Sequence, residues 1–102
     1  MGSLYNQQNM KTYELMTIGK ASLGEDGAKT LSATVNSLIV TLKGKLVDEN
    51  TMGKRKFAYE INHDKEGFYN LMHFEMDPTV LEKFKEKLNR EVGLVRYLIT
   101  AL

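Results

Sequence analysis

Few residues of the types that most often do chemistry occur in this chain of 102 residues. It has two histidines, His63 and His73, and no cysteine. Disulfides and thiolate metal sites are therefore excluded, and neither histidine has a carboxylate at ligand spacing beside it. The eight glycines stand singly, so the chain has neither a nucleotide-binding glycine loop nor a G-x-S-x-G nucleophile motif. The sequence predicts no enzyme, no cofactor and no metal site.

A loop near the first predicted strand bears on one remaining enzyme class. Residues 19–27 read GKASLGEDG, whereas acyl-phosphate hydrolases of related topology have a glycine loop there that ends in arginine and binds an anion. The two acids, Glu25 and Asp26, would repel a phosphate. A small-molecule regulatory or enzymatic domain therefore remains an alternative that a deep, polar-lined pocket would support.

Basic residues gather around one stretch, although the composition is balanced. Fourteen basic against thirteen acidic residues give a net charge of +1, so composition alone does not indicate a nucleic-acid binder. Lys54, Arg55 and Lys56 are adjacent, however, and Lys65 follows near the tip of the same stretch. Cations displayed along a defined edge suit contact with phosphates. The alternative is an edge strand that carries lysine to discourage strand pairing.

The stretch from Gly53 to Met76 is predicted to be a long β-hairpin, because its apolar residues alternate with polar ones on both sides of a polar turn at 62–67. Its second strand begins at Phe68. One face of that strand would carry Tyr69, Leu71 and His73, an exposed apolar surface fit for contact with another molecule.

The same strand also permits a second interpretation. In RNA-recognition motifs the third strand carries aromatic side chains that stack on bases. Residues 66–74 read EGFYNLMHF, where Glu66 replaces a cation and Asn70 replaces an aromatic residue, and the first strand lacks a matching aromatic platform. A free-standing RNA-recognition-motif-like RNA-binding module is therefore the alternative function, with Tyr69 stacking on a base.

The remaining pattern gives the order strand, helix, strand, strand, helix, strand. Strands are predicted at 11–19, from 45 with a kink near 51–53, and at 94–101; helices are predicted at 28–43, capped by Gly44, and from Asp77-Pro78 to about 88. Right-handed crossovers place both helices on one side. The predicted fold is α+β, a ferredoxin-like split β-α-β sandwich with a four-stranded antiparallel sheet and two helices on one face.

Strand periodicity assigns side chains to the two faces of this sheet. The residues expected to meet the helices are Tyr13, Leu15, Phe57 or Tyr59, Met72, Phe74, Tyr97 and Ile99. Those expected on the open face are Glu14, Met16, Tyr69, Leu71, His73, Arg96 and Leu98. The polar residues 1–9 are predicted to be a disordered extension or a remnant foreign to the domain, which then occupies 10–102. The sequence has no apolar run of about 18 residues and no signal-peptide core, so a cytoplasmic protein is expected.

The hairpin and both ends of the domain resemble a known family, the bacterial small-subunit ribosomal protein numbered six. Its hairpin signature is matched in register by Gly53, Arg55, Ala58, Tyr59, Ile61, Gly67, Phe68 and Tyr69. Its opening is matched by Met10, Lys11, Tyr13 and Glu14, and its closing run by Val95, Arg96 and Leu98. The chain departs from the family at Phe57, where leucine is usual, at Met52 and at Asn89, and no charged tail follows Leu102.

The resemblance implies a structural component of the small ribosomal subunit, in the cytoplasm, that binds central-domain rRNA together with ribosomal protein number eighteen. By this analogy the RNA contacts would be Lys11, Lys54, Arg55, Lys56, Arg90 and Arg96. Contact with the protein partner would be made by Tyr69 and Leu71. Neither a membrane nor a small-molecule substrate is expected as a partner.

Overall fold

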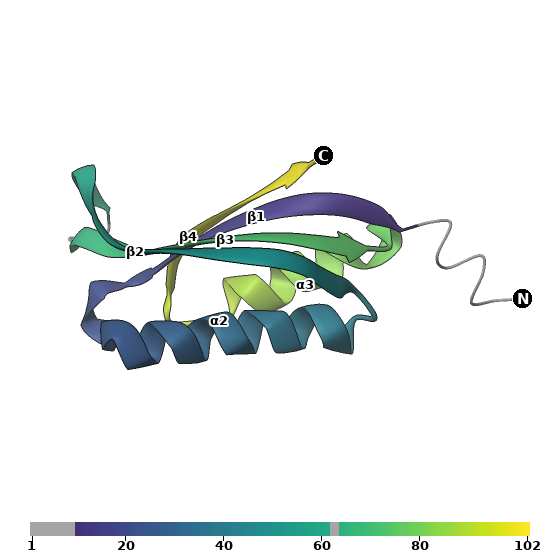
Figure 1. Ribbon diagram of the computed structural model, residues 1–102, viewed down its shortest axis with the longest axis horizontal. Coiled ribbons are helices and arrows are strands. Elements are labelled where there is room, and N and C mark those ends of the chain that lie inside the picture. Colours follow the sequence, from purple (N-terminus) through teal and green to yellow (C-terminus); the bar gives the residue numbers. More distant parts are fainter. Residues whose placement is uncertain (1–9, 62–63) are drawn as a thin grey trace, which may run out of the picture.

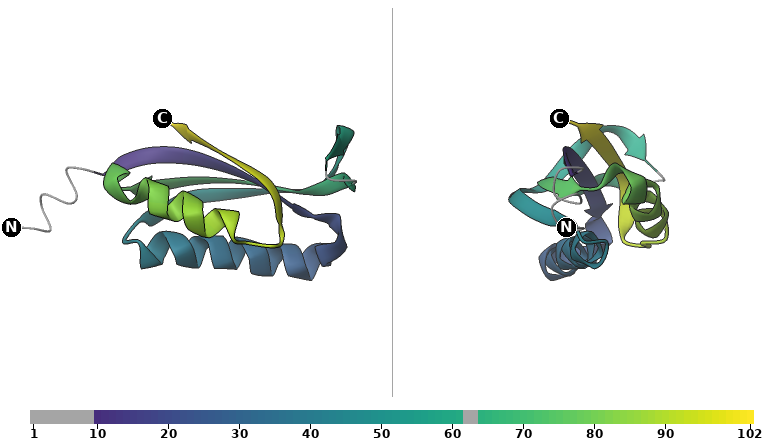
Figure 2. Two further views of the ribbon diagram at one scale, coloured as in Figure 1. Left: turned by 180° about the vertical axis from the view of Figure 1, so that it is seen from behind. Right: turned by 90° about the vertical axis from the view of Figure 1, so that its right-hand side faces the viewer.

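The computed structural model describes residues 10–61 and 64–102. In chain order its elements are β1 (Lys11–Lys20), η1 (Ala21–Leu23), α2 (Gly24–Thr41), β2 (Lys45–Ile61), β3 (Asp64–Met76), η2 (Pro78–Val80), α3 (Leu81–Asn89) and β4 (Leu94–Ala101). The strands form one antiparallel sheet in the order β2-β3-β1-β4. Both α-helices lie under one face, and the other face is open (Figures 1 and 2). The predicted ferredoxin-like sandwich is confirmed; the prediction for 1–9 lies outside the described residues.

The first helix is longer than its apolar spacing predicted. It follows the short 3-10 helix η1 and starts at Gly24, so the prediction of a loop over 20–27 was wrong. Glu25 and Asp26 lie in its first turn, where negative side chains interact favourably with the helix dipole. At the other end Lys43 takes the left-handed conformation, with φ 64°. The amide of Gly44, the predicted cap, then donates to the Ile39 carbonyl at 2.8 Å.

The β2–β3 hairpin also extends further than predicted. Strand β3 begins at Asp64, so residues 64–67, predicted as part of the turn, are extended instead; residues 62 and 63 lie outside the described part. The predicted kink is present, because the β2–β3 register shifts between Thr51 and Gly53 and Gly53 has φ 78°. Such bulges bend and twist a strand, and the far end of the hairpin turns up toward the open face (Figure 1).

The core lies between the sheet and the two helices. Phe74 is fully buried on β3, and its ring centroid lies 5.5 Å from that of Tyr13 and 5.3 Å from that of Phe84 on α3. Of the residues predicted to face the helices, Tyr13, Leu15, Met72 and Phe74 are buried, while Tyr97 and Ile99 are partly buried and packed against the core. Phe57 was assigned wrongly, as described below, and the side chain of Tyr59 lies outside the described ones.

Candidate nucleic-acid and partner interface

The middle of the open face is apolar. Residues paired across neighbouring antiparallel strands point to the same face. The register pairs Met16 of β1 with Leu71 of β3 on one side and with Leu98 of β4 on the other. Leu98 is 58% exposed, and the other two side chains are partly exposed. We call Met16, Leu71 and Leu98 the apolar band; it is continuous across three strands and suits contact with another protein.

A row of charged side chains borders this band on the side away from the hairpin end. His73 of β3 lies between two carboxylates: its Nδ1 is 2.7 Å from Asp48 Oδ1 on β2, and its Nε2 is 3.0 Å from Glu14 Oε1 on β1. Each ring nitrogen meets a different carboxylate, so the three groups do not converge on one point. Among the described residues no set of three His, Asp or Glu side chains is arranged to hold a metal ion.

The two carboxylates raise the pKa of His73 above its ordinary value of about 6.5, chiefly through the hydrogen bond to Glu14 and then through that to Asp48. Because the folded protein binds this proton more tightly than the unfolded chain does, the stabilisation is fully present below pH ~6.5. It is lost as the pH rises through the raised pKa.

We expect an NMR titration of the His73 ring to give a pKa above 6.5 in the wild type. In Glu14→Gln the pKa should be lower. Equal pKa values in the two proteins would contradict the assigned contact.

The hairpin end of the open face is aromatic. Phe57 points to this face and not to the helices: its ring centroid lies 6.1 Å from that of Tyr69 at an interplanar angle of 61°. Ile18, which pairs with Tyr69 across β1 and β3, is only 3% exposed although it is not part of the core between sheet and helices. The physical reason is the bend of the hairpin, which brings Phe57 over the open face.

The three adjacent cations of β2, Lys54, Arg55 and Lys56, do not lie on one face of the sheet. Lys54 and Lys56 pair with Phe68 and Glu66 on the helix side of the sheet; Lys54 Nζ lies 3.7 Å from Glu66 Oε1 and 6.0 Å from the Phe68 ring centroid. Arg55 pairs with Gly67 on the open side, and its Nε donates to the Met52 carbonyl at 3.3 Å. All three side chains are exposed.

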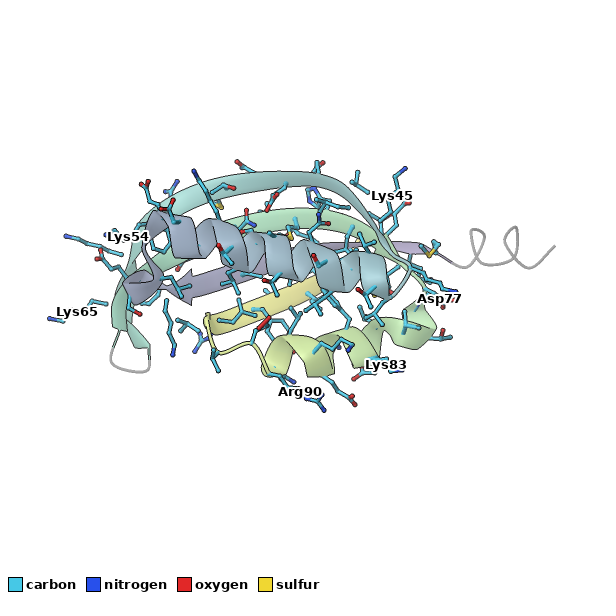
Figure 3. All side chains as sticks on the ribbon, turned by 90° about the horizontal axis from the view of Figure 1, so that it is seen from below. Lys45, Lys54, Lys65, Asp77, Lys83 and Arg90 are labelled. Carbon is cyan, nitrogen blue, oxygen red and sulfur yellow. The ribbon has the colours of Figure 1, made fainter. Side chains whose placement is uncertain are left out.

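The six residues predicted to contact RNA are spread over the molecule. Lys11 pairs with Met76 and Lys54 with Phe68, eight residues along β3, which corresponds to about 27 Å at ~3.4 Å per residue. Arg90 follows α3 on the helix side, away from Lys54 (Figure 3). Arg96 is exposed on the open face, where it pairs with Ile18. The structure thus brings Lys54, Arg55, Lys56 and Arg96 to the hairpin end and leaves Lys11 and Arg90 apart.

One cation at this end was missed by the sequence analysis. Lys20 is the last residue of β1, pairs with Gly67 and is exposed. Gly67 also pairs with Arg55 on its other side, so the two cations flank it at about 10 Å across the sheet. The signal was present, because Lys20 continues the alternation of Met16 and Ile18, although the predicted strand ends at Gly19. We call the open-face cations Lys20, Arg55 and Arg96 the basic end.

A cleft of about 550 Å³ opens on the helix side between α2 and strands β2 and β3. One of its buried polar residues is Asn70, 5% exposed, whose Nδ2 donates to Glu49 Oε2 at 2.6 Å and Ser32 Oγ at 3.0 Å. The bond to Ser32 fastens α2 to the sheet and the bond to Glu49 joins β3 to β2, so these polar groups have a structural use. The Ser32 hydroxyl and the Glu49 carboxylate of the cleft both accept from Asn70, Lys54 is paired with Glu66, and His73 lies on the other face of the sheet. The cleft gives no support to the enzymatic alternative.

No helix in the described part of the chain is long and apolar enough to cross a membrane.

Comparison with known proteins points to one family. The family model described as ribosomal protein S6 matches residues 12–101. Among solved structures, 30S ribosomal protein S6 from Thermotoga maritima is 29% identical with a TM-score of 0.86, and the match covers 91% of this chain and 88% of that one.

Other solved structures share the fold at lower identity. The C-terminal domain of the MgtC protein from Mycobacterium tuberculosis is 15% identical with a TM-score of 0.63, covering 93% of this chain and 90% of that one. A structure of the chemotaxis kinase CheA P2 domain with CheY, from Thermotoga maritima, gives 18% identity and a TM-score of 0.58, covering 91% of this chain and 99% of that one. At these identities the likeness shows the fold alone.

The family match spans both the hairpin signature and the terminal strands. It favours the resemblance to the ribosomal protein family over a free-standing RNA-recognition module. The chain therefore belongs to the ribosomal protein S6 family and is a structural, non-enzymatic protein of the small ribosomal subunit.

Proposed function

We propose that this protein binds central-domain rRNA of the small subunit together with ribosomal protein number eighteen, on the cytoplasmic ribosome. The observation that carries the proposal is the division of the open face into a basic end and an apolar band. One part suits a phosphate backbone and the other suits a protein neighbour, and both lie on the same continuous sheet surface.

The RNA contact is centred on the hairpin end. Arg55 and Arg96 are exposed there on the open face, and Lys54 and Lys56 project from the same end on the helix side. The Lys54 side chain remains exposed although it pairs with Glu66. A surface ion pair of this kind is weak, so Lys54 can exchange the carboxylate for a phosphate. Lys11 and Arg90 lie on other parts of the surface. We propose them as outlying contacts to a large RNA that wraps around the protein.

The protein partner contacts the apolar band. Leu71 is its central strand residue, flanked by Met16 and Asn50 in the register, while Tyr69 lies at its border with the hairpin end. An apolar segment of the partner laid across the band would cover Leu98 as well, the most exposed of the three. Leu71 is therefore the centre of the proposed contact, and Tyr69 its edge.

The proposal is tested by the affinity of the protein, mixed with ribosomal protein number eighteen, for a central-domain rRNA fragment and for an unrelated RNA of equal length. We expect a preference for the central-domain fragment and an affinity that falls steeply with salt. Arg55→Gln and Arg96→Gln should each reduce the log–log salt slope by about 0.7–0.9. Lys83→Gln, an exposed cation on α3 away from the open face, should leave the slope unchanged.

Equal affinity for the two RNAs would contradict the proposal. If Lys83→Gln changed the slope as much as Arg55→Gln, the RNA contact would be a general charge effect and not one localised at the hairpin end.

A further inference from the structure

We propose that the hairpin end of the open face holds an unpaired nucleotide of the RNA, with its base against the Phe57–Tyr69 pair and its flanking phosphates at Lys20, Arg55 and Arg96. This inference rests on the proposed function and deepens it, because it assigns the aromatic residues to RNA and adds Lys20 to the contacts.

The aromatic pair is fixed in place by its surroundings. The Phe57 ring approaches the backbone at Gly67, where a Cβ atom would lie 2.9 Å from Phe57 Cζ and 2.8 Å from Ile18 Cγ2. Ile18, which lies beneath the rings, is 3% exposed, so the rings pack on an apolar side chain that solvent does not reach. Phe57 and Tyr69 themselves remain partly exposed and meet edge to face at 6.1 Å. Aromatic rings held in this way stack on the bases of single strands with little preference for base identity.

The cations surround this pair at the spacing of neighbouring strands. Lys20 and Arg55 flank Gly67, and Arg96 is separated from Tyr69 by Ile18 alone. Each is therefore within about 10 Å of the aromatic pair, measured between backbones. Successive phosphates of a single strand that crosses the sheet could each meet one of these flexible side chains.

The charge of the open face favours RNA over protein at this end. Among the described carboxylates of the open face, those of Glu14 and Asp48 lie nearest to Tyr69. They belong to the row through His73, which lies four residues further along β3 than Tyr69. That is about 13 Å away, beyond the apolar band. The described carboxylate of Glu66 faces the helix side, where it pairs with Lys54. A polyanion therefore meets attraction at the hairpin end and repulsion beyond the band, so RNA and partner occupy different parts of one face.

The test uses the full chain with ribosomal protein number eighteen and measures two affinities for each variant, one for the central-domain rRNA fragment and one for the protein partner. Phe57→Leu keeps an apolar side chain but removes a ring of the aromatic pair; it should weaken RNA binding about 10-fold or more and leave partner binding unchanged. Lys20→Gln, an exposed change that does not touch the aromatic pair, should lower the salt slope by about 0.7. Leu71→Ser tests the apolar band. It should weaken partner binding and leave RNA binding by the protein alone unchanged. Ultraviolet cross-linking of the wild-type complex should map RNA to the peptides that contain Phe57 or Tyr69.

Wild-type RNA affinity in Phe57→Leu, or a loss confined to partner binding, would overturn the nucleotide site and assign the aromatic pair to the protein interface. An unchanged salt slope in Lys20→Gln would overturn the assignment of Lys20. A wild-type pair without preference for central-domain rRNA would instead contradict the proposed function itself.

Discussion

Replacing Phe74 by alanine should lower the free energy of unfolding by about 3–5 kcal/mol. Phe74 is 0% exposed and joins the ring of Tyr13 on β1 to that of Phe84 on α3. Its removal leaves a cavity between a central strand and a helix that neither can fill by moving alone. Urea unfolding followed by circular dichroism measures the change. A loss of this size is a large part of the stability of a domain of this length.

Val92→Ala is the matched control, because Val92 is 83% exposed and its truncation should change stability by less than ~0.5 kcal/mol. A change below 1 kcal/mol in Phe74→Ala would show that the core does not lie between the sheet and the helices around this ring.

A methyl group at Gly67 should also be strongly unfavourable. In Gly67→Ala the added Cβ would lie 2.8 Å from the Gly19 carbonyl oxygen and from Ile18 Cγ2, and 2.9 Å from Phe57 Cζ. Since the oxygen belongs to the backbone of a paired strand, the clash cannot be relieved by turning one side chain. We expect a loss of about 1–3 kcal/mol, together with displacement of Phe57 from the open face. Chemical denaturation measures the first effect, and nuclear Overhauser contacts between Phe57 and Ile18 report the second.

Gly93→Ala serves as the glycine control. Its Cβ would first meet Leu23 Cδ1 at 3.3 Å, the end of a flexible side chain, so a smaller loss is expected. If Gly67→Ala were no more harmful than Gly93→Ala, the hairpin would not rest on β1 as described.

The fold could be predicted because its signals are local. Apolar spacing in the helices and alternation in the strands assigned Tyr13, Leu15, Met72 and Phe74 to the core, and Asp77 with Pro78 marked the second helical segment. There the Asp77 carboxylate accepts the Thr79 amide at 2.9 Å. The boundaries were less certain from sequence, because residues 24–27 combine glycines with acids and are equally typical of a loop and of a first helical turn.

The candidate site could be predicted only in part, because its geometry depends on contacts between distant segments. Alternation placed Leu71, His73 and Arg96 on the open face, where the register confirms them. It could not show that the hairpin bends, and so it could not place Phe57 over Ile18. Nor could spacing reveal that His73 meets Asp48 and Glu14, which lie 25 and 59 positions away in the chain.

The most direct test of the central claim, that this protein works as a part of the small ribosomal subunit, is sedimentation. The tagged chain, expressed in its native host, is followed through a sucrose gradient of the lysate at low salt. We expect it to sediment with the small subunit and to be released when the salt concentration is raised, because cations at the hairpin end contribute to its binding. Recovery at the top of the gradient at low salt, apart from the ribosomal fractions, would contradict it.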